Sequence, residues 1–188
     1  MIILASQSPR RKEILKDILG DIPFDTIPSD FNEREIKEKN VKKLCLLEAQ
    51  GKGRTVALMH PRDVVISSDT MVYYNGKQLG KPKDEQDVYR MLRMLSGAVH
   101  EVVTAYSIQK GNSELIHRVC VAKIYIEKMS DYEIQCYIDT GSPFDKAGAY
   151  GIQDKDCIET KIISGDYYTV MGLPRDELEN DLVDLGII

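Results

Sequence analysis

Residues 64 to 68 read Val-Val-Ile-Ser-Ser, an unbroken apolar run that closes on two hydroxyl side chains. Such a run is typical of a central strand buried on both faces, and its polar end indicates where the strand meets a site. Asp69 follows directly, although aspartate is disfavoured in strands. We therefore predict that the strand ends here and that Asp69 is either a cap or a site residue.

The segments on both sides of this strand alternate between strand and helix patterns. Met1 to Ala5 predicts a short buried strand, and Ser8-Pro9 an N-cap with proline at the first position of a helix that Gly20 ends. Asn75-Gly76 and Gly111-Asn112 each predict a hairpin. The other expected elements are strands at 22–28, 99–109, 114–127 and 158–163, helices at 40–58, 84–95, 130–140 and from Arg175, and a polar loop at 30–37.

This mixture of elements predicts an α/β fold. We expect a central mixed, bent β-sheet flanked by helices, with two lobes and a cleft between them. The chain of 188 residues has the length of one domain, and it contains no repeat, low-complexity tract or linker. A single domain over residues 1–188 is therefore expected.

Composition narrows the class of protein. The four cysteines form no C-x-x-C pair and no histidine stands at metal-ligand spacing, so reduced thiols in a cytoplasmic protein are expected. The apolar start is too short for a signal peptide, and no window approaches the roughly eighteen apolar residues of a membrane span. The net charge of -5 argues against a general nucleic-acid binder. The expected partner is a small molecule, with neither nucleic acid nor membrane involved.

The run Asp-Lys-Ala-Gly-Ala-Tyr-Gly-Ile-Gln at 145–153 is the clearest indication of that small molecule. Gly148 and Gly151 allow the backbone to approach a ligand closely. Lys146 offers a point charge for phosphate, and Gln153 carries both a donor and an acceptor for a base edge. A nucleotide would use all three features.

A second candidate for anion binding is Ser-Gln-Ser-Pro-Arg-Arg at 6–11. Ser6 stands at the start of a predicted helix whose N-terminal N–H groups attract phosphate, and Arg10 and Arg11 can bind phosphate bidentately. The alternative is a capped surface helix with solvated arginines. Both interpretations remain open at this level.

Other charged residues are ambiguous when each is taken alone. Glu33 lies in an acidic loop, where a carboxylate can ligate Mg²⁺ or be merely solvated. Lys52, between two glycines, and Lys81, in Leu-Gly-Lys-Pro, read individually as surface lysines. The chain lacks the G-x-x-x-x-G-K-[ST] and G-x-G-x-x-G patterns, which excludes P-loop and Rossmann phosphate sites.

Six motifs in a fixed order connect these residues. They are Leu-Ala-Ser-Gln-Ser-Pro-Arg-Arg (4–11), Ser-Asp-Thr (68–70), Leu-Gly-Lys-Pro (79–82), Leu-Ser-Gly-x-x-His (95–100), Asp-Lys-Ala-Gly-Ala-Tyr-Gly-Ile-Gln (145–153) and Gly-Leu-Pro (172–174). Over essentially its whole length the chain resembles the Maf family. That resemblance implies the fold that Maf proteins share with inosine triphosphatase, and a nucleoside triphosphate pyrophosphatase that uses Mg²⁺ or Mn²⁺.

The resemblance also implies a role for each matching residue. Asp69 would be the catalytic base, and Glu33 with Asp69 would hold the metal. Substrate choice would depend on Arg10, Thr70 and Gln153. Phosphate contacts would come from Ser6, Arg11, Lys52, Lys81 and Lys146. The chain departs from the family pattern at Ser67-Ser68, where Gly-Ala is usual, and at Ala105, where Gly is usual.

The form Pro-Arg-Arg resembles the branch of the family that hydrolyses dTTP and UTP, since the branch that prefers 7-methyl-GTP has an aromatic residue at the position of Arg10. We expect dTTP, UTP and related modified pyrimidine nucleotides as substrates. The alternative is a nucleotide-binding regulator of cell division without essential turnover. A homodimer is one possible assembly.

Overall fold

The computed structural model describes residues 1–33 and 36–188, which form a mixed α/β fold. Its seven-stranded sheet has the order β2-β1-β3-β5-β6-β7, with β4 paired to β3. β1 runs parallel to β2 and β3, whereas the β3–β4 and β6–β7 pairs are antiparallel. The predicted mixed sheet flanked by helices is therefore confirmed. In the described part of the chain, no helix is both long and apolar enough to cross a membrane.

The chain divides into two compact units, and the expectation of a single domain stays a prediction. The first comprises residues 1–69, 104–120 and 171–188, and the second residues 70–103 and 121–170. Three long strands contribute residues to both units: β3 (Val64–Tyr74), β5 (Val99–Lys110) and β6 (Ser113–Ile126).

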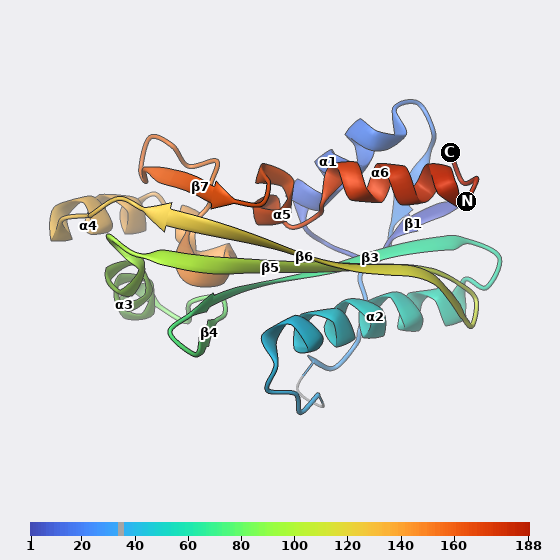
Figure 1. Cartoon of the computed structure of the whole chain (residues 1–188), viewed down its shortest axis with the longest axis horizontal. Helices are drawn as coiled ribbons and strands as arrows, with labels where there is room; N and C mark the ends of the chain where they lie inside the picture. Colours follow the sequence, from blue (N-terminus) through green and yellow to red (C-terminus); the bar gives the residue numbers. More distant parts are fainter. Residues whose placement is uncertain (34–35) are drawn as a thin grey trace. The chain divides into compact units, whose positions relative to one another are not determined.

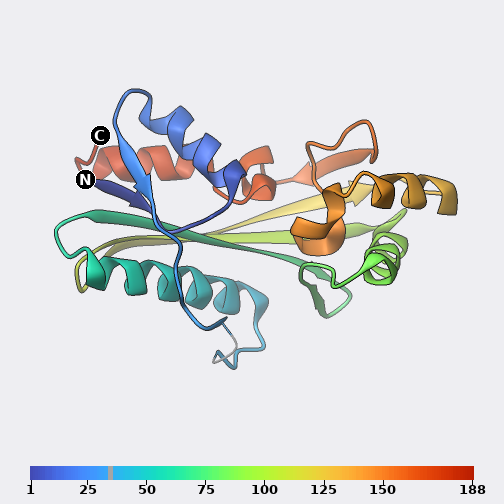
Figure 2. The same ribbon diagram turned by 180° about the vertical axis from the view of Figure 1, so that it is seen from behind.

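The first unit carries helices on both faces of its strands (Figures 1 and 2). α1 and α6 lie side by side on one face, and α2 covers the other. Its remaining elements are β1 (Ile2–Leu4), α1 (Pro9–Leu19), β2 (Phe24–Thr26), α2 (Val41–Met59) and α6 (Arg175–Asp184). Fully buried Ile3, Val56 and Val65 join β1, α2 and β3 in one apolar cluster. Each such side chain contributes about 1.5–3 kcal/mol by leaving water.

The second unit packs α3 against α4 and against the second of the two short helices that follow α4. Its elements are β4 (Lys77–Leu79), α3 (Glu85–Leu95), α4 (Asp131–Asp139), the 3₁₀ helices η2 (Ser142–Asp145) and η3 (Ala147–Ala149), β7 (Thr160–Ser164) and most of α5 (Tyr167–Met171). A capping box of Ser130 and Glu133 opens α4. The capping box fixes where α4 begins, and the loop that carries the 145–153 motif follows the end of this helix.

Two predictions about the fold need correction. The strand predicted to end at residue 68 continues as β3 to Tyr74, so Asp69 lies within the strand and not at its end. A carboxylate is tolerated there because Lys52 lies 2.6 Å from it and balances its charge. α5 was not predicted, since a helix of five residues is too short to show a periodic apolar pattern.

Candidate active site

Three carboxylates meet in the first unit. Glu33, Glu48 and Asp69 each bring one oxygen to within 4.8 Å of the others. Glu48 and Asp69 are buried, whereas Glu33 is exposed. Carboxylates this close to one another repel, and a cation among them reduces that repulsion.

Successive side chains of β3 point to opposite faces of the sheet, and this alternation decides which of them face the cluster. Ser67 donates to the Ala49 carbonyl oxygen of α2 at 2.7 Å, and Asp69, two residues on, also faces α2. Ser68 points to the opposite face, where its Oγ lies 2.8 Å from the carbonyl oxygens of Ala105 and Gly172. The two hydroxyl residues thus fix β3 on both faces just before Asp69.

Lys52 of α2 supplies the cation. Its Nζ lies 2.6 Å from Glu33 Oε1 and 2.6 Å from Asp69 Oδ1. Burial alone lowers the pKa of Lys52, but the two carboxylates more than offset this and raise the pKa above its usual value. Lys52 therefore stays charged, and it is a constituent of the cluster and not the surface lysine that its sequence context suggests.

Two glycines on either side of Lys52 allow α2 to come this close. A Cβ on Gly51 would lie 2.3 Å from the Phe31 ring, and a Cβ on Gly53 would lie 2.5 Å from Ser67 Oγ. Glycine normally weakens a helix interior by about 1 kcal/mol relative to alanine. Here its small size allows the contact between α2 and β3, and that contact brings Lys52 to Asp69.

Gly53→Ala tests this geometry. In an ordinary helix the change raises stability, but here we expect the melting temperature and kcat/KM to fall together, because the new methyl group displaces α2 from Ser67 and Lys52 from Asp69. The double variant Gly53→Ala/Ser67→Ala removes the clashing hydroxyl and should recover much of both losses. Calorimetry and steady-state kinetics measure them. A rise in melting temperature for Gly53→Ala alone would contradict the close approach.

Glu48 is the member of the cluster that sequence reasoning missed. Burial, followed by the charges of Asp69 and Glu33, raises the pKa of its carboxyl to about 8. One signal was present: Glu48 precedes Lys52 by four residues, so a helix places both side chains on the same face. An acidic residue on the buried face of a predicted helix could have directed attention to it.

The cluster fits a hard divalent cation. It gathers three carboxyl groups around one point, and carboxylate oxygens are ligands of the kind that Mg²⁺ and Mn²⁺ prefer. Glu33, Glu48 and Asp69 could thus hold such an ion. Glu48 adds a third carboxylate to the pair expected from the sequence.

The structure also brings Ser6 and Arg11 together. Ser6 Oγ accepts from Arg11 Nη1 at 3.4 Å and from the Ser8 backbone N–H at 3.2 Å. Arg11 Nε donates to the Gly172 carbonyl oxygen at 2.8 Å, the same oxygen that Ser68 contacts. Burial lowers the pKa of the Arg11 guanidinium, and Asp69 is the charge that most offsets this. Neighbouring Arg10 is half-buried.

The remaining predicted site residues belong to the second unit. Thr70 is half-buried, Lys81 and Gln153 are exposed, and Lys146 is buried. A Cβ on Gly151 would lie 2.7 Å from Lys146 Cε and 2.8 Å from Gln153 Oε1. The structure therefore places the predicted phosphate and base contacts of this loop beside one glycine.

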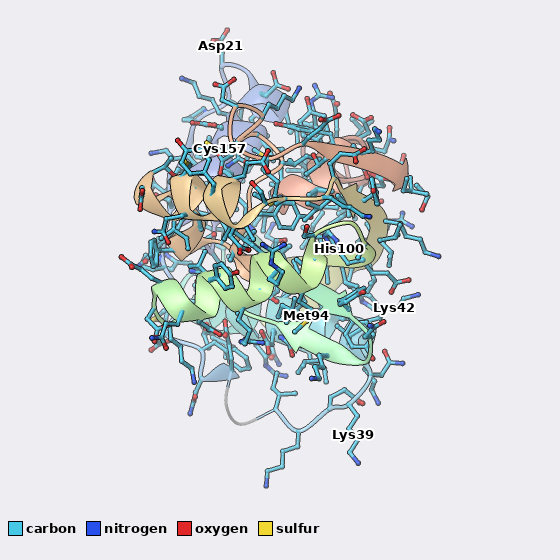
Figure 3. All side chains as sticks on the ribbon, turned by 90° about the vertical axis from the view of Figure 1, so that its left-hand side faces the viewer. Asp21, Lys39, Lys42, Met94, His100 and Cys157 are labelled. Carbon is cyan, nitrogen blue, oxygen red and sulfur yellow. The ribbon has the colours of Figure 1, made fainter. Side chains whose placement is uncertain are left out.

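His100 belongs to the same unit and is labelled in Figure 3. It is buried, and its Nε2 lies 2.7 Å from Tyr150 Oη. Burial lowers the pKa of this imidazole to about 4. His100 is thus a neutral partner for the glycine-bearing loop. Lys39 and Lys42, by contrast, are exposed side chains that extend away from the ribbon (Figure 3).

Comparisons with known proteins identify relatives of this chain and a similar fold. The family described as "Maf-like protein" matches residues 1–185. A dTTP/UTP pyrophosphatase of Clostridium botulinum (strain Kyoto / Type A2) is 43% identical over 192 residues, covering 99% of this chain and 97% of that protein. One of Pyrococcus furiosus is 46% identical over 175 residues, covering 92% and 89%. The solved structure of the Staphylococcus aureus Ham1 protein has a TM-score of 0.53 at 16% identity, covers 98% of each chain and supports the fold alone.

Proposed function

The chain belongs to the Maf family, and we propose that it is a nucleoside triphosphate pyrophosphatase that hydrolyses dTTP and UTP to the nucleoside monophosphate and pyrophosphate. The observation that carries the proposal is the buried Asp69, held by Lys52 at 2.6 Å within a cluster of three carboxylates. Relatives that share 43% and 46% of their residues with this chain bear the name dTTP/UTP pyrophosphatase.

Asp69 is proposed to orient and deprotonate the water that attacks the α-phosphorus. Lys52 holds Oδ1 at 2.6 Å, Glu48 hydrogen-bonds to the Asp69 carboxyl group, and the weakly donating Cys45 thiol lies 3.9 Å from Oδ2. A carboxylate has about four lone-pair sites, so Asp69 can also accept a proton from water. Burial, followed by the charge of Asp69, raises the pKa of Cys45, so the thiol stays protonated and does not compete as a nucleophile.

A divalent cation held by Glu33, Glu48 and Asp69 would polarise the phosphoryl oxygens when bound. The protein's own cations, Arg11, Lys81 and Lys146, are proposed to offset the negative charge that develops on the departing pyrophosphate. Gln153 is exposed, so its amide is free to turn towards a base, and with Arg10 and Thr70 it is proposed to govern substrate choice. The proposed setting is the cytoplasm.

A nucleotide panel with product analysis tests the function. We expect dTTP and UTP to yield monophosphate and pyrophosphate, with kcat/KM at least about tenfold above that for ATP, GTP or 7-methyl-GTP, equivalent to about 1.4 kcal/mol. EDTA should abolish turnover, and Mg²⁺ or Mn²⁺ should restore it. Products of nucleoside diphosphate and orthophosphate would contradict the proposed bond. Saturable binding without turnover would indicate a regulator instead.

A further inference from the structure

The loop from Ser142 to Asp154 in the second unit carries two of the proposed substrate contacts. Lys146 and Gln153 lie against Gly151, so the position of this glycine determines how the two side chains are spaced. Gln153 is exposed, whereas only 8% of the Lys146 side chain is. A triphosphate that uses both side chains needs that spacing to be set before it binds.

Asp154 collects the hydrogen bonds that hold this loop. Tyr137 of α4 donates its hydroxyl to Asp154 Oδ2 at 2.5 Å, and Ser142 donates to the same oxygen at 2.8 Å. The ammonium nitrogen of Lys146 lies 3.9 Å from that oxygen. One carboxylate thus connects α4, the start of the loop and the buried lysine.

Each of the two hydroxyl oxygens also accepts a hydrogen bond from the loop. Tyr137 Oη accepts from the Gly151 backbone N–H at 2.9 Å, and Ser142 Oγ accepts from Lys146 Nζ at 2.9 Å. Because an ionised carboxylate only accepts, both hydroxyls must point their hydrogens at Asp154 and their lone pairs at the loop. The charge of Asp154 therefore orients the chains that reach Gly151 and Lys146.

Burial makes this arrangement hard to replace by water. Tyr137 is fully buried, so losing its hydroxyl leaves the Gly151 N–H without that acceptor. Lys146 Nζ directs its other hydrogen bonds to the Ser142 carbonyl oxygen at 2.5 Å and to Asp145 Oδ1 at 2.8 Å. Since the Asp145 side chain is 65% exposed, this is the bond that Lys146 can most readily exchange for a phosphate oxygen.

We propose that Asp154 and Tyr137 are positioning residues that set Lys146 and Gln153 for the triphosphate and the base. This inference rests on the proposed function, because it concerns the same substrate. It predicts a loss of substrate discrimination and affinity in addition to any loss of stability. A merely structural role would lower stability and leave the ratio of kcat/KM values between nucleotides unchanged.

The test compares Tyr137→Phe and Asp154→Asn with a matched control, Tyr106→Phe. Tyr106 is also fully buried and donates to a carboxylate, Asp181 Oδ2, at 2.5 Å, but both residues belong to the first unit and lie outside the 142–154 loop. We expect both loop variants to raise the KM for dTTP and to lower the dTTP-to-ATP ratio of kcat/KM by at least about fivefold, as Gln153→Ala should. Tyr106→Phe should lower the melting temperature and leave the ratio unchanged.

Ser142→Ala serves as a milder variant if the other two do not fold, and we expect the same direction of change because it removes the hydroxyl that bridges Lys146 and Asp154. An unchanged KM and ratio in the folded loop variants, or an equal change in Tyr106→Phe, would overturn the inference. Binding of the non-hydrolysable α,β-methylene analogue of dTTP distinguishes a failure of this inference from a failure of the proposed function. If the wild type binds the analogue without hydrolysing dTTP, the function fails, and weaker binding by Asp154→Asn still supports positioning.

Discussion

Asp69→Asn is expected to lower kcat for dTTP by about 10³-fold, within the range of 10²–10⁴ that positioned general bases contribute. Asparagine keeps the size of the side chain and an oxygen that can face Lys52, but it cannot accept a proton from water. It also removes one of the three carboxylates that would hold a divalent cation. Single-turnover kinetics would measure the chemical step free of product release.

The control for this variant is its folded state. Loss of the negative charge reduces repulsion with Glu48 and Glu33 while it weakens the bond to Lys52, so we expect a melting temperature close to that of the wild type. Binding of Mn²⁺, followed by its paramagnetic signal, should weaken. Turnover within threefold of the wild type, in a protein with unchanged melting temperature, would exclude Asp69 as the base.

Lys52→Met is expected to lower both activity and stability. The methionine keeps the apolar stem but removes the ammonium that lies 2.6 Å from both Glu33 and Asp69, and removal of one partner from a buried pair costs about 3–5 kcal/mol. We expect the melting temperature of the metal-free protein to fall clearly and kcat/KM for dTTP to fall about 100-fold. Thermal unfolding in EDTA and steady-state kinetics measure the two effects.

Two further variants make this result specific. The first is Lys43→Met, a change on the same helix. Lys43 pairs with Glu38 at 3.2 Å, but the Lys43 side chain is 67% exposed, so we expect little change in melting temperature or kcat/KM. Lys52→Met/Glu48→Gln removes one of the three clustered carboxyl groups and should regain part of the stability without regaining activity. Equal losses in Lys43→Met and Lys52→Met would refute a special role for Lys52.

Local signals predicted most of the elements. Ser8, Asn40, Asp84 and Ser130 each cap a helix within one residue of its predicted start, because a cap acts through backbone groups three residues away or fewer. The β5–β6 hairpin follows from Gly111-Asn112 in the same way. The six ordered motifs were likewise sufficient to predict the family, and the family comparison confirms that prediction.

The site could be predicted only in part. The sequence singles out Asp69, Glu33 and Lys52 through their resemblance to a pattern, but not the contacts of 2.6 Å that join them. Glu48 was not predicted as a site residue, because only the packing of α2 against β3 brings it close to Asp69. The role of Asp154 was not predicted, because its hydrogen-bond partners, Tyr137 and Ser142, are 17 and 12 residues away in the sequence.

The sequence by itself determined most of the elements, the helix starts and the family, since these depend on neighbours along the chain or on fixed motif order. Only the tertiary structure decided that Asp69 lies inside a strand, that half-buried Lys52 lies between two carboxylates, and that Asp154 bonds to the residues that hold the loop of Lys146. The physical reason is charge compensation. A buried ion is stable only where packing brings its partner within about 3–4 Å, and packing is a property of segments distant in the chain.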